Sequence, residues 1–119
     1  MVDIDNTICY NKNSNYEQSQ PDIERIAKLN KLFDEGHEIH YWTARGAISG
    51  KNWDEFTVNQ LNDWGVKYTS INMGKPHYDV WIDDKALNAE DVCISKLLVD
   101  HKAVEKYDGC VLNSQDECE

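Results

Sequence analysis

Met1-Val2-Asp3-Ile4-Asp5-Asn6-Thr7 opens the chain, and this stretch decides both the expected fold and the expected chemistry. Two carboxylates lie two residues apart after an apolar start. Because side chains in a strand repeat every two residues, Asp3 and Asp5 point the same way if the strand continues through them. Two like charges this close are tolerated where a cation lies between them or where one carboxyl keeps a proton. The stretch therefore predicts a site for metal-assisted phosphoryl transfer.

The size and charge of the chain limit its possible partners. With 119 residues it has the length of one domain, 1–119, without room for a large separate lid domain. Its net charge of −10 repels DNA and RNA, so we expect no nucleic-acid partner. No apolar run has the length of a membrane span, so we expect no membrane partner.

The four cysteines favour a cytoplasmic protein with free thiols. They form no CxxC pair and no cluster with His at zinc spacing. No signal peptide is recognisable before the first carboxylates, which agrees with that expectation.

Helical and strand patterns alternate along the chain. The expected elements are a short strand running into a loop over 1–8, a loop or small hairpin flap over 9–20, a helix from Pro21 to Gly36, a strand over 37–42, a helix from Asn52 to Gly65, and strands over 67–73 and 79–82. Pro21 suits a first helical turn, and Asn52 with Glu55 resembles a capping box. Beyond Lys85 the pattern weakens: we expect a helix, or a strand and a helix, over 88–104 and a frayed tail over 113–119. This order is typical of an α/β fold with a parallel sheet flanked by helices.

Chemically apt side chains follow each expected strand. Asp3 and Asp5 follow the first, Thr43 the second, Lys75 the third, and the pair 83–84 (Asp-Asp) the fourth. Ligands of such sheets bind beyond the carboxyl ends of the strands. The sequence therefore predicts that these residues meet in one site.

The same residues resemble four motifs of the haloacid dehalogenase (HAD) superfamily. Asp3-Ile4-Asp5-Asn6-Thr7 is similar to its DxDx[TV] motif, Thr43 to its second motif, Lys75 to its third, and Asp83-Asp84 to its fourth acidic pair. Over residues 1 to about 90, Gly74-Lys75-Pro76 and Asp83-Asp84-Lys85-Ala86 resemble the small capless phosphatases described as capsular polysaccharide biosynthesis phosphatases. The resemblance implies a single doubly wound, Rossmann-like HAD domain, a three-layer sandwich without a large cap.

The resemblance also implies roles for the four carboxylates. Asp3 is expected to be the nucleophile that forms an aspartyl-phosphate, and Asp5 the general acid and then the general base. Mg²⁺ is the implied cofactor, held by the carboxylates of Asp3 and Asp83 and by the main-chain carbonyl of Asp5. Asp84 is expected to act as a further ligand or through a water molecule.

The remaining candidate residues are expected to bind substrate. Thr43 and the amides after it, at Ala44 and Arg45, suit the oxygens of the transferring phosphoryl group. The side chain of Arg45 contacts substrate or pairs with an acid on the surface, and both roles stay open. Asn6 contacts the leaving group or forms a turn.

Lys75 is expected to balance the negative charge of carboxylates and phosphate. Its catalytic role resembles that of the third HAD motif, and Lys67 and Lys85 are alternatives for this charge.

The leading functional hypothesis is a Mg²⁺-dependent phosphomonoester hydrolase acting on a small phosphate or a sugar phosphate. A nucleic-acid or nucleotide end phosphatase is an alternative that the charge disfavours. A non-catalytic binding or partner domain is another, which the intact motif residues disfavour. Because the flap over 9–20, with Tyr10 and Tyr16, is the only candidate lid, we also expect that a homo-oligomer could supply a lid.

One feature departs from the HAD pattern. In that family several apolar residues lead into the nucleophile, whereas only Met1 and Val2 precede Asp3. A central strand usually needs about five residues. We therefore expect either a very short first strand or a chain that begins upstream, with the fold intact and the nucleophile loosely anchored.

Overall fold

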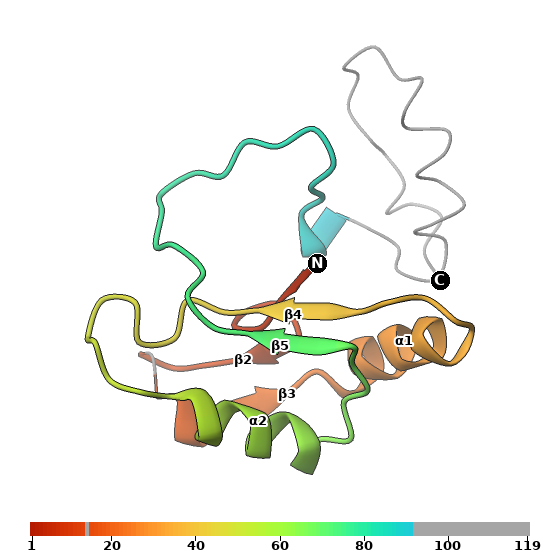
Figure 1. Cartoon of the computed structure of the whole chain (residues 1–119), viewed down its shortest axis with the longest axis horizontal. Helices are drawn as coiled ribbons and strands as arrows, with labels where there is room; N and C mark the ends of the chain where they lie inside the picture. The colour runs from red at the N-terminus through yellow and green to blue at the C-terminus, as the bar shows by residue number, and fades with distance from the viewer. Residues whose placement is uncertain (14, 92–119) are drawn as a thin grey trace. The chain divides into compact units, whose positions relative to one another are not determined.

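The computed structural model describes residues 1–13 and 15–91, and the chain divides after Val80 into two units. The elements of the first unit are β1 (Val2–Asp3), β2 (Cys9–Tyr10), a 3-10 helix (Tyr16–Gln18), β3 (Gln20–Pro21), α1 (Ile23–Asp34), β4 (His40–Trp42), α2 (Asp54–Asp63) and β5 (Ser70–Asn72) (Figure 1). The described part of the second unit contains a 3-10 helix, Ala89–Asp91. The structure describes the element expected over 88–104 only as far as residue 91, and the tail expected over 113–119 lies outside the described residues. The single-domain organisation stays a prediction.

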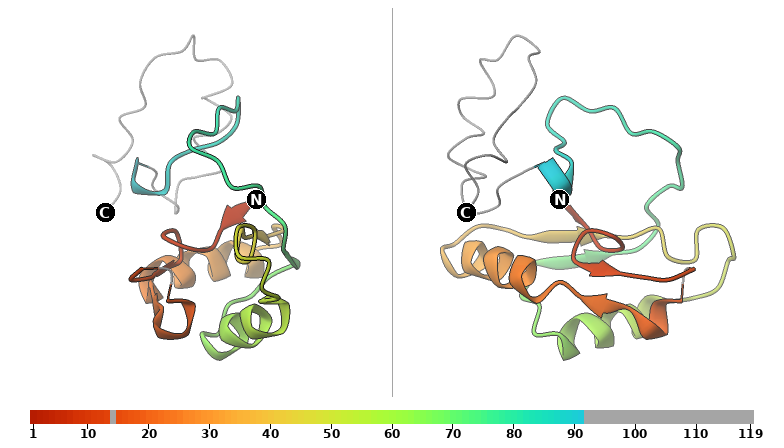
Figure 2. Two further views of the ribbon diagram at one scale, coloured as in Figure 1. Left: turned by 90° about the vertical axis from the view of Figure 1, so that its left-hand side faces the viewer. Right: turned by 180° about the vertical axis from the view of Figure 1, so that it is seen from behind.

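The first unit is built on a parallel sheet in the order β1-β4-β5. Val2 pairs with Tyr41, and Tyr41 with Ile71. Successive parallel strands joined by crossovers of one hand place their helices on the same face, and α1 and α2 lie together on one face of this sheet (Figures 1 and 2). The parallel α/β sheet is thus confirmed, whereas the third layer of a doubly wound fold stays a prediction.

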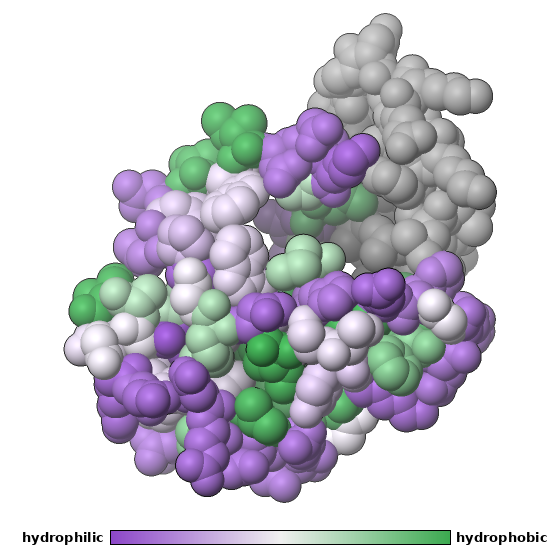
Figure 3. Space-filling model, in the orientation of Figure 1, coloured by the Kyte–Doolittle hydropathy of each residue, from purple (hydrophilic) through white to green (hydrophobic). Residues whose placement is uncertain are grey.

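The core of this unit lies between the sheet and its two helices. Ile4, Tyr41 and Leu61 are fully buried, and Leu29 of α1 is 2% exposed. Burying an aliphatic side chain of this size stabilises the fold by about 1.5–3 kcal/mol. Hydrophilic side chains cover much of the outward surface over α1 and α2 (Figure 3). None of the described helices has the length and apolar character needed to cross a membrane.

The flap over 9–20 is a small hairpin, which is one of the two structures expected from the sequence. β2 and β3 pair antiparallel, with Cys9 opposite Pro21 and Tyr10 opposite Gln20. Pro21 therefore belongs to the hairpin, and the prediction that it opens the helix is wrong. Asp22 is the N-cap instead, accepting the amide of Arg25 at 3.0 Å.

The predicted capping box at the second helix is also wrong. α2 begins at Asp54, and its N-cap Trp53 makes no side-chain cap bond. Asn52 accepts the amide of Asp54 at 2.9 Å and forms a local turn instead of capping the helix.

Two strands are shorter than predicted because neighbouring groups engage their first residues. The amide of His37 donates to the carbonyl of Leu32 at 3.1 Å, after Gly36 has turned the chain at a φ of 102°. The amide of Lys67 donates to Asn30 of α1 at 2.8 Å. β4 and β5 therefore start only at His40 and Ser70.

The predicted strand over 79–82 is not formed. Val80 is 75% exposed and Ile82 92% exposed, in contrast to the buried strand that the apolar pattern predicts. Asp83 instead organises a local turn, accepting the amide of Lys85 at 3.0 Å and the indole N–H of Trp81 at 3.3 Å. An Asx turn of this kind competes with strand pairing.

Candidate active site

Asp3 ends β1 and pairs with a lysine that lies 72 residues further along the chain. Lys75 Nζ is 3.2 Å from Asp3 Oδ1, and Thr7 Oγ1 donates to Oδ2 at 3.3 Å. The Asp3 side chain stays 35% exposed, whereas that of Lys75 is 13% exposed. The partly exposed carboxylate of Asp3 is therefore held against the largely buried ammonium group of Lys75.

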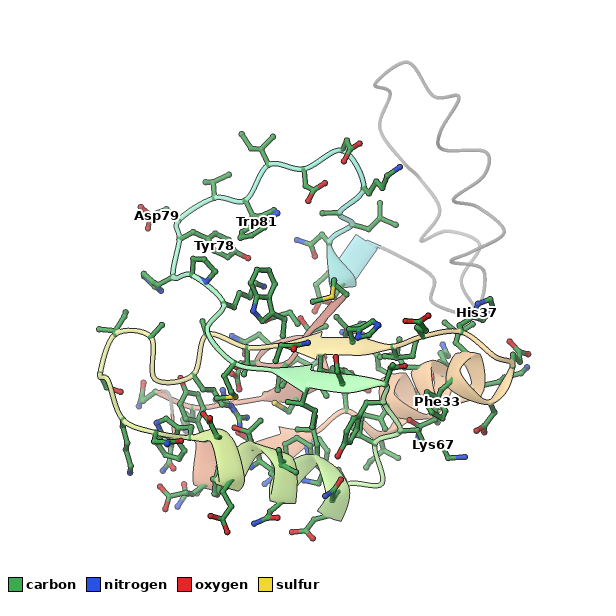
Figure 4. The ribbon with its side chains drawn as sticks, in the orientation of Figure 1. Phe33, His37, Lys67, Tyr78, Asp79 and Trp81 are labelled. Carbon is green, nitrogen blue, oxygen red and sulfur yellow. The ribbon has the colours of Figure 1, made fainter. Side chains whose placement is uncertain are left out.

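The loop after β5 holds Lys75 by its main chain. The Lys75 amide donates to the carbonyl of Thr43 at 2.9 Å, which ties this loop to the end of β4. The Tyr78 ring centroid lies 5.4 Å from Nζ, within cation–π range. Figure 4 shows Tyr78 and Asp79 on this segment, far from Lys67, which precedes β5.

Thr43 directly follows β4, is fully buried and lies beside Asp5. Its amide donates to the carbonyl of Asn72 at 3.0 Å, and its hydroxyl lies 3.4 Å from Asp5 Oδ2. The amide of Arg45, expected to bind phosphoryl oxygens, donates to Thr43 Oγ1 at 3.1 Å. Ala44 accepts the amide of Ala47 through its carbonyl, which continues the turn.

Asn6 forms a turn between Asp5 and Thr7. Its φ of 63° places it in the left-handed region, which Asn tolerates better than most residues. Its amide donates to the carbonyl of Cys9 at 2.7 Å, and the amides of Thr7 and Ile8 donate to that of Ile4. The turn function, one of the two expected for Asn6, thus has direct structural support.

Asp5 forms an ion pair with Arg45, whose side chain is fully buried. Arg45 Nη2 lies 2.9 Å from Asp5 Oδ1, and Nε lies 3.2 and 3.1 Å from the two carboxylate oxygens. Asn11 Nδ2 donates to Asp5 Oδ1 at 2.7 Å from the flap. Of the two roles expected for Arg45, the structure shows the pairing with an acid, although this acid lies in the site and not on the surface.

Gly46 makes the turn that follows Arg45. At its φ of 82°, a Cβ atom would lie 2.3 Å from the carbonyl oxygen of Lys51, so a side chain would force the loop apart. The glycine therefore keeps the backbone after Arg45 close to the segment that leads into α2.

Cys9 lies beside Asp5 and is buried. Its Sγ is 3.7 Å from Asp5 Oδ1 and 3.9 Å from Arg45 Nη2. Burial, followed by the charge of Asp5, raises the pKa of Cys9 to about 12, so the thiol is neutral at physiological pH. A neutral buried thiol is a poor nucleophile, which leaves the carboxylates as the reactive groups of this site.

Besides Cys9, four residues of the site are not identified by sequence reasoning as site residues. They are Asn11, Tyr16, Thr57 and Gln60. Tyr16 is recognisable only as a large side chain of the flap. Thr57 and Gln60 follow the helical spacing of α2, but nothing local to them indicates that they face an arginine.

The predicted metal ligands are divided between the two units, with Asp3 and Asp5 in the first. Among residues 1–13 and 15–91, no group of three or more His, Cys, Asp or Glu could hold a metal ion. Asp83 and Asp84 belong to the second unit, which is described by itself. There the amide of Lys85, then Asp84 and Trp81, lower the pKa of Asp83. Asp3 supplies the hard oxygen donors that Mg²⁺ prefers, and the complete ligand set stays a prediction.

The comparisons with known proteins support the fold alone. No protein-family model and no curated protein match the chain. The chain is similar to the crystal structure of an MCSG target from Vibrio cholerae, with a TM-score of 0.72 and 27% sequence identity over 88% of this chain and 94% of that chain. The protein is therefore an α/β protein with a parallel sheet.

Proposed function

We propose that this chain is a Mg²⁺-dependent phosphomonoester hydrolase of the HAD type, acting on a small phosphate or a sugar phosphate. The observation that carries the proposal is that residues from the ends of three strands contact one another. Lys75, after β5, bonds Asp3 at the end of β1 through its side chain and the carbonyl of Thr43, after β4, through its amide. The Thr43 hydroxyl in turn lies 3.4 Å from Asp5. A surface Asp-x-Asp without a role has no need of a mostly buried lysine at 3.2 Å.

In the first half-reaction a carboxylate oxygen of Asp3 attacks the phosphorus atom. The bond from phosphorus to the leaving oxygen breaks, and that oxygen takes a proton from Asp5. In the second half-reaction, water attacks the phosphorus atom of the aspartyl-phosphate and gives a proton to Asp5. Asp3 and inorganic phosphate are released, so the net reaction consumes one water molecule.

The remaining groups stabilise charge. Lys75 lies where it offsets the negative charge that collects on Asp3 and the phosphoryl group. Asp3, the main-chain carbonyl of Asp5, and Asp83 with Asp84 would hold Mg²⁺, which supplies further charge neutralisation when bound.

Hydrolysis of p-nitrophenyl phosphate tests the proposal. We expect turnover with Mg²⁺, none with EDTA, and none for Asp3→Asn, which keeps the size of the side chain. Asp34→Asn is the matched control, because Asp34 pairs with Lys67 on the exposed surface. Turnover that ignores both EDTA and Asp3→Asn would contradict the mechanism. Sugar phosphates, nucleotides and 3′-phosphorylated oligonucleotides then define the substrate class.

A further inference from the structure

The guanidinium of Arg45 has no free donor for a substrate. A guanidinium carries five N–H donors. Nε and Nη2 donate to Asp5, Nη2 also lies 3.9 Å from Cys9 Sγ, and Nη1 donates to Thr57 at 3.3 Å and Gln60 at 2.8 Å. With its side chain fully buried, Arg45 reaches substrate only by giving up one of these partners.

The contacts to Arg45 come from separate parts of the first unit. The flap places the Tyr16 ring 4.6 Å from the guanidinium carbon, within cation–π range. Gln60 of α2 accepts from Arg45 and donates to the carbonyl of Tyr16 at 2.7 Å. Trp53 packs edge-on against Tyr16 at 4.9 Å. A buried cation is costly unless its partners are this complete, so the position of Arg45 is closely defined.

The carboxylate of Asp5 is fixed by this arrangement and still reaches the site. Arg45 binds it with a two-nitrogen fork, Asn11 donates from the flap, and Thr43 lies on the side of the sheet. Its side chain keeps 21% exposure. Arg45, Asn11 and Thr43 all donate hydrogen bonds to Asp5. Such donors favour the ionised carboxylate, which is the form that accepts a proton from water.

We propose that Arg45 is a positioning residue that aims Asp5 at the water molecule attacking the aspartyl-phosphate. The proposal rests on the proposed function and gives both the flap and α2 a role in positioning Asp5. Loss of the fork frees the carboxylate to rotate, and a misplacement of about 1 Å costs roughly 100-fold in rate.

Pre-steady-state hydrolysis of p-nitrophenyl phosphate separates this role from a structural one. Its leaving group needs little protonation, so the first half-reaction depends weakly on Asp5 while the second depends on it fully. For Arg45→Gln we expect a burst of p-nitrophenolate followed by turnover slowed roughly 100-fold, the pattern also expected for Asp5→Asn. The double variant should be no slower than Asp5→Asn, because both changes remove one function.

Gln60→Ala keeps the test decisive if Arg45→Gln fails to fold. This substitution leaves Asp5 and Arg45 in place but removes an acceptor of Arg45 and the hydrogen bond to Tyr16. We again expect a burst of p-nitrophenolate followed by slowed turnover, with a smaller slowing than for Arg45→Gln. Asn62→Ala is the matched control on α2, because Asn62 bonds the exposed Tyr68 hydroxyl at 3.0 Å.

Three outcomes overturn the proposal. Equal loss of burst rate and turnover in both the Arg45 and Gln60 variants indicates a structural role, and additive losses in the double variant indicate independent functions. Both leave the phosphatase intact if the wild-type protein turns over and Asp3→Asn does not. An inactive wild-type protein removes the proposed function and this role together.

Discussion

Asp3 and Asp5 are two residues apart, yet their surroundings differ sharply. Asp3 has one cation, Lys75, and one hydroxyl, and its side chain is 35% exposed. Asp5 is held by a fully buried arginine and by a flap amide, and its side chain is 21% exposed. A nucleophile has to be accessible to the substrate, whereas an acid–base group has to be held in a fixed orientation toward the leaving group and the attacking water. The asymmetry thus matches the division of labour in the proposed mechanism.

Replacing Lys75 by Met tests the Asp3 surroundings and should have the largest effect. Removing one well-placed charge stabiliser lowers kcat about 100- to 1,000-fold. Steady-state kinetics with p-nitrophenyl phosphate measure the change. Lys67→Met and Lys85→Met remove the two alternative lysines and should leave kcat unchanged. A drop for Lys85→Met with normal kcat for Lys75→Met would assign the counter-charge to Lys85.

Replacing Arg45 by Met tests the Asp5 surroundings through stability. The change leaves a largely enclosed carboxylate without its cation, and breaking such a pair costs about 3 kcal/mol. Urea unfolding measures the free energy. Lys67→Met is the control, because its pair with Asp34 is half exposed and contributes about 0.2–1 kcal/mol.

The double variant Asp5→Asn with Arg45→Met sharpens this stability comparison. Neutralising Asp5 should recover part of the loss, because the penalty comes from an unpaired charge. A loss for Arg45→Met as small as that for Lys67→Met would show that Asp5 needs no buried partner.

The contrast between the two carboxylates also shows what sequence can predict. Spacing and strand ends correctly bring Asp3, Thr43 and Lys75 together, because parallel strands align their carboxyl ends. The contacts that hold Arg45 against Asp5 cannot be predicted in this way. Tyr16 and Gln60 come from a flap and a helix whose packing is set by tertiary contacts.

The strand predicted over 79–82 fails for a related reason. A short apolar run shows that a segment can be buried but not that it finds a partner strand. Asp83 offers the local chain an Asx turn instead. Pro21 likewise has the fixed φ of a helix start, yet the hairpin partner Cys9 and the stronger N-cap at Asp22 decide the boundary.

Asp22 links the flap to the start of α1, and its replacement should have the smallest effect. Its carboxylate caps α1 at Arg25 and accepts the Tyr10 hydroxyl at 2.9 Å. Asp22→Ala should lower the unfolding free energy by about 1 kcal/mol at pH 7, whereas Asp22→Asn keeps a capping oxygen and should lose less. Chemical unfolding of both variants measures the difference.

The pH dependence of that difference identifies the ionised carboxylate as its source. Burial acts to raise the pKa of Asp22, but the Arg25 amide, the Tyr10 hydroxyl and the charges of Arg25 and Lys28 outweigh burial and lower it. A lowered folded-state pKa stabilises the protein above the unfolded value of about 3.9, and this stabilisation is lost as the pH falls through the folded value. The advantage of wild type over Asp22→Asn should therefore be constant above about pH 5 and shrink in acid. An advantage that persists unchanged in acid would instead assign it to hydrogen-bond geometry that the amide fails to reproduce.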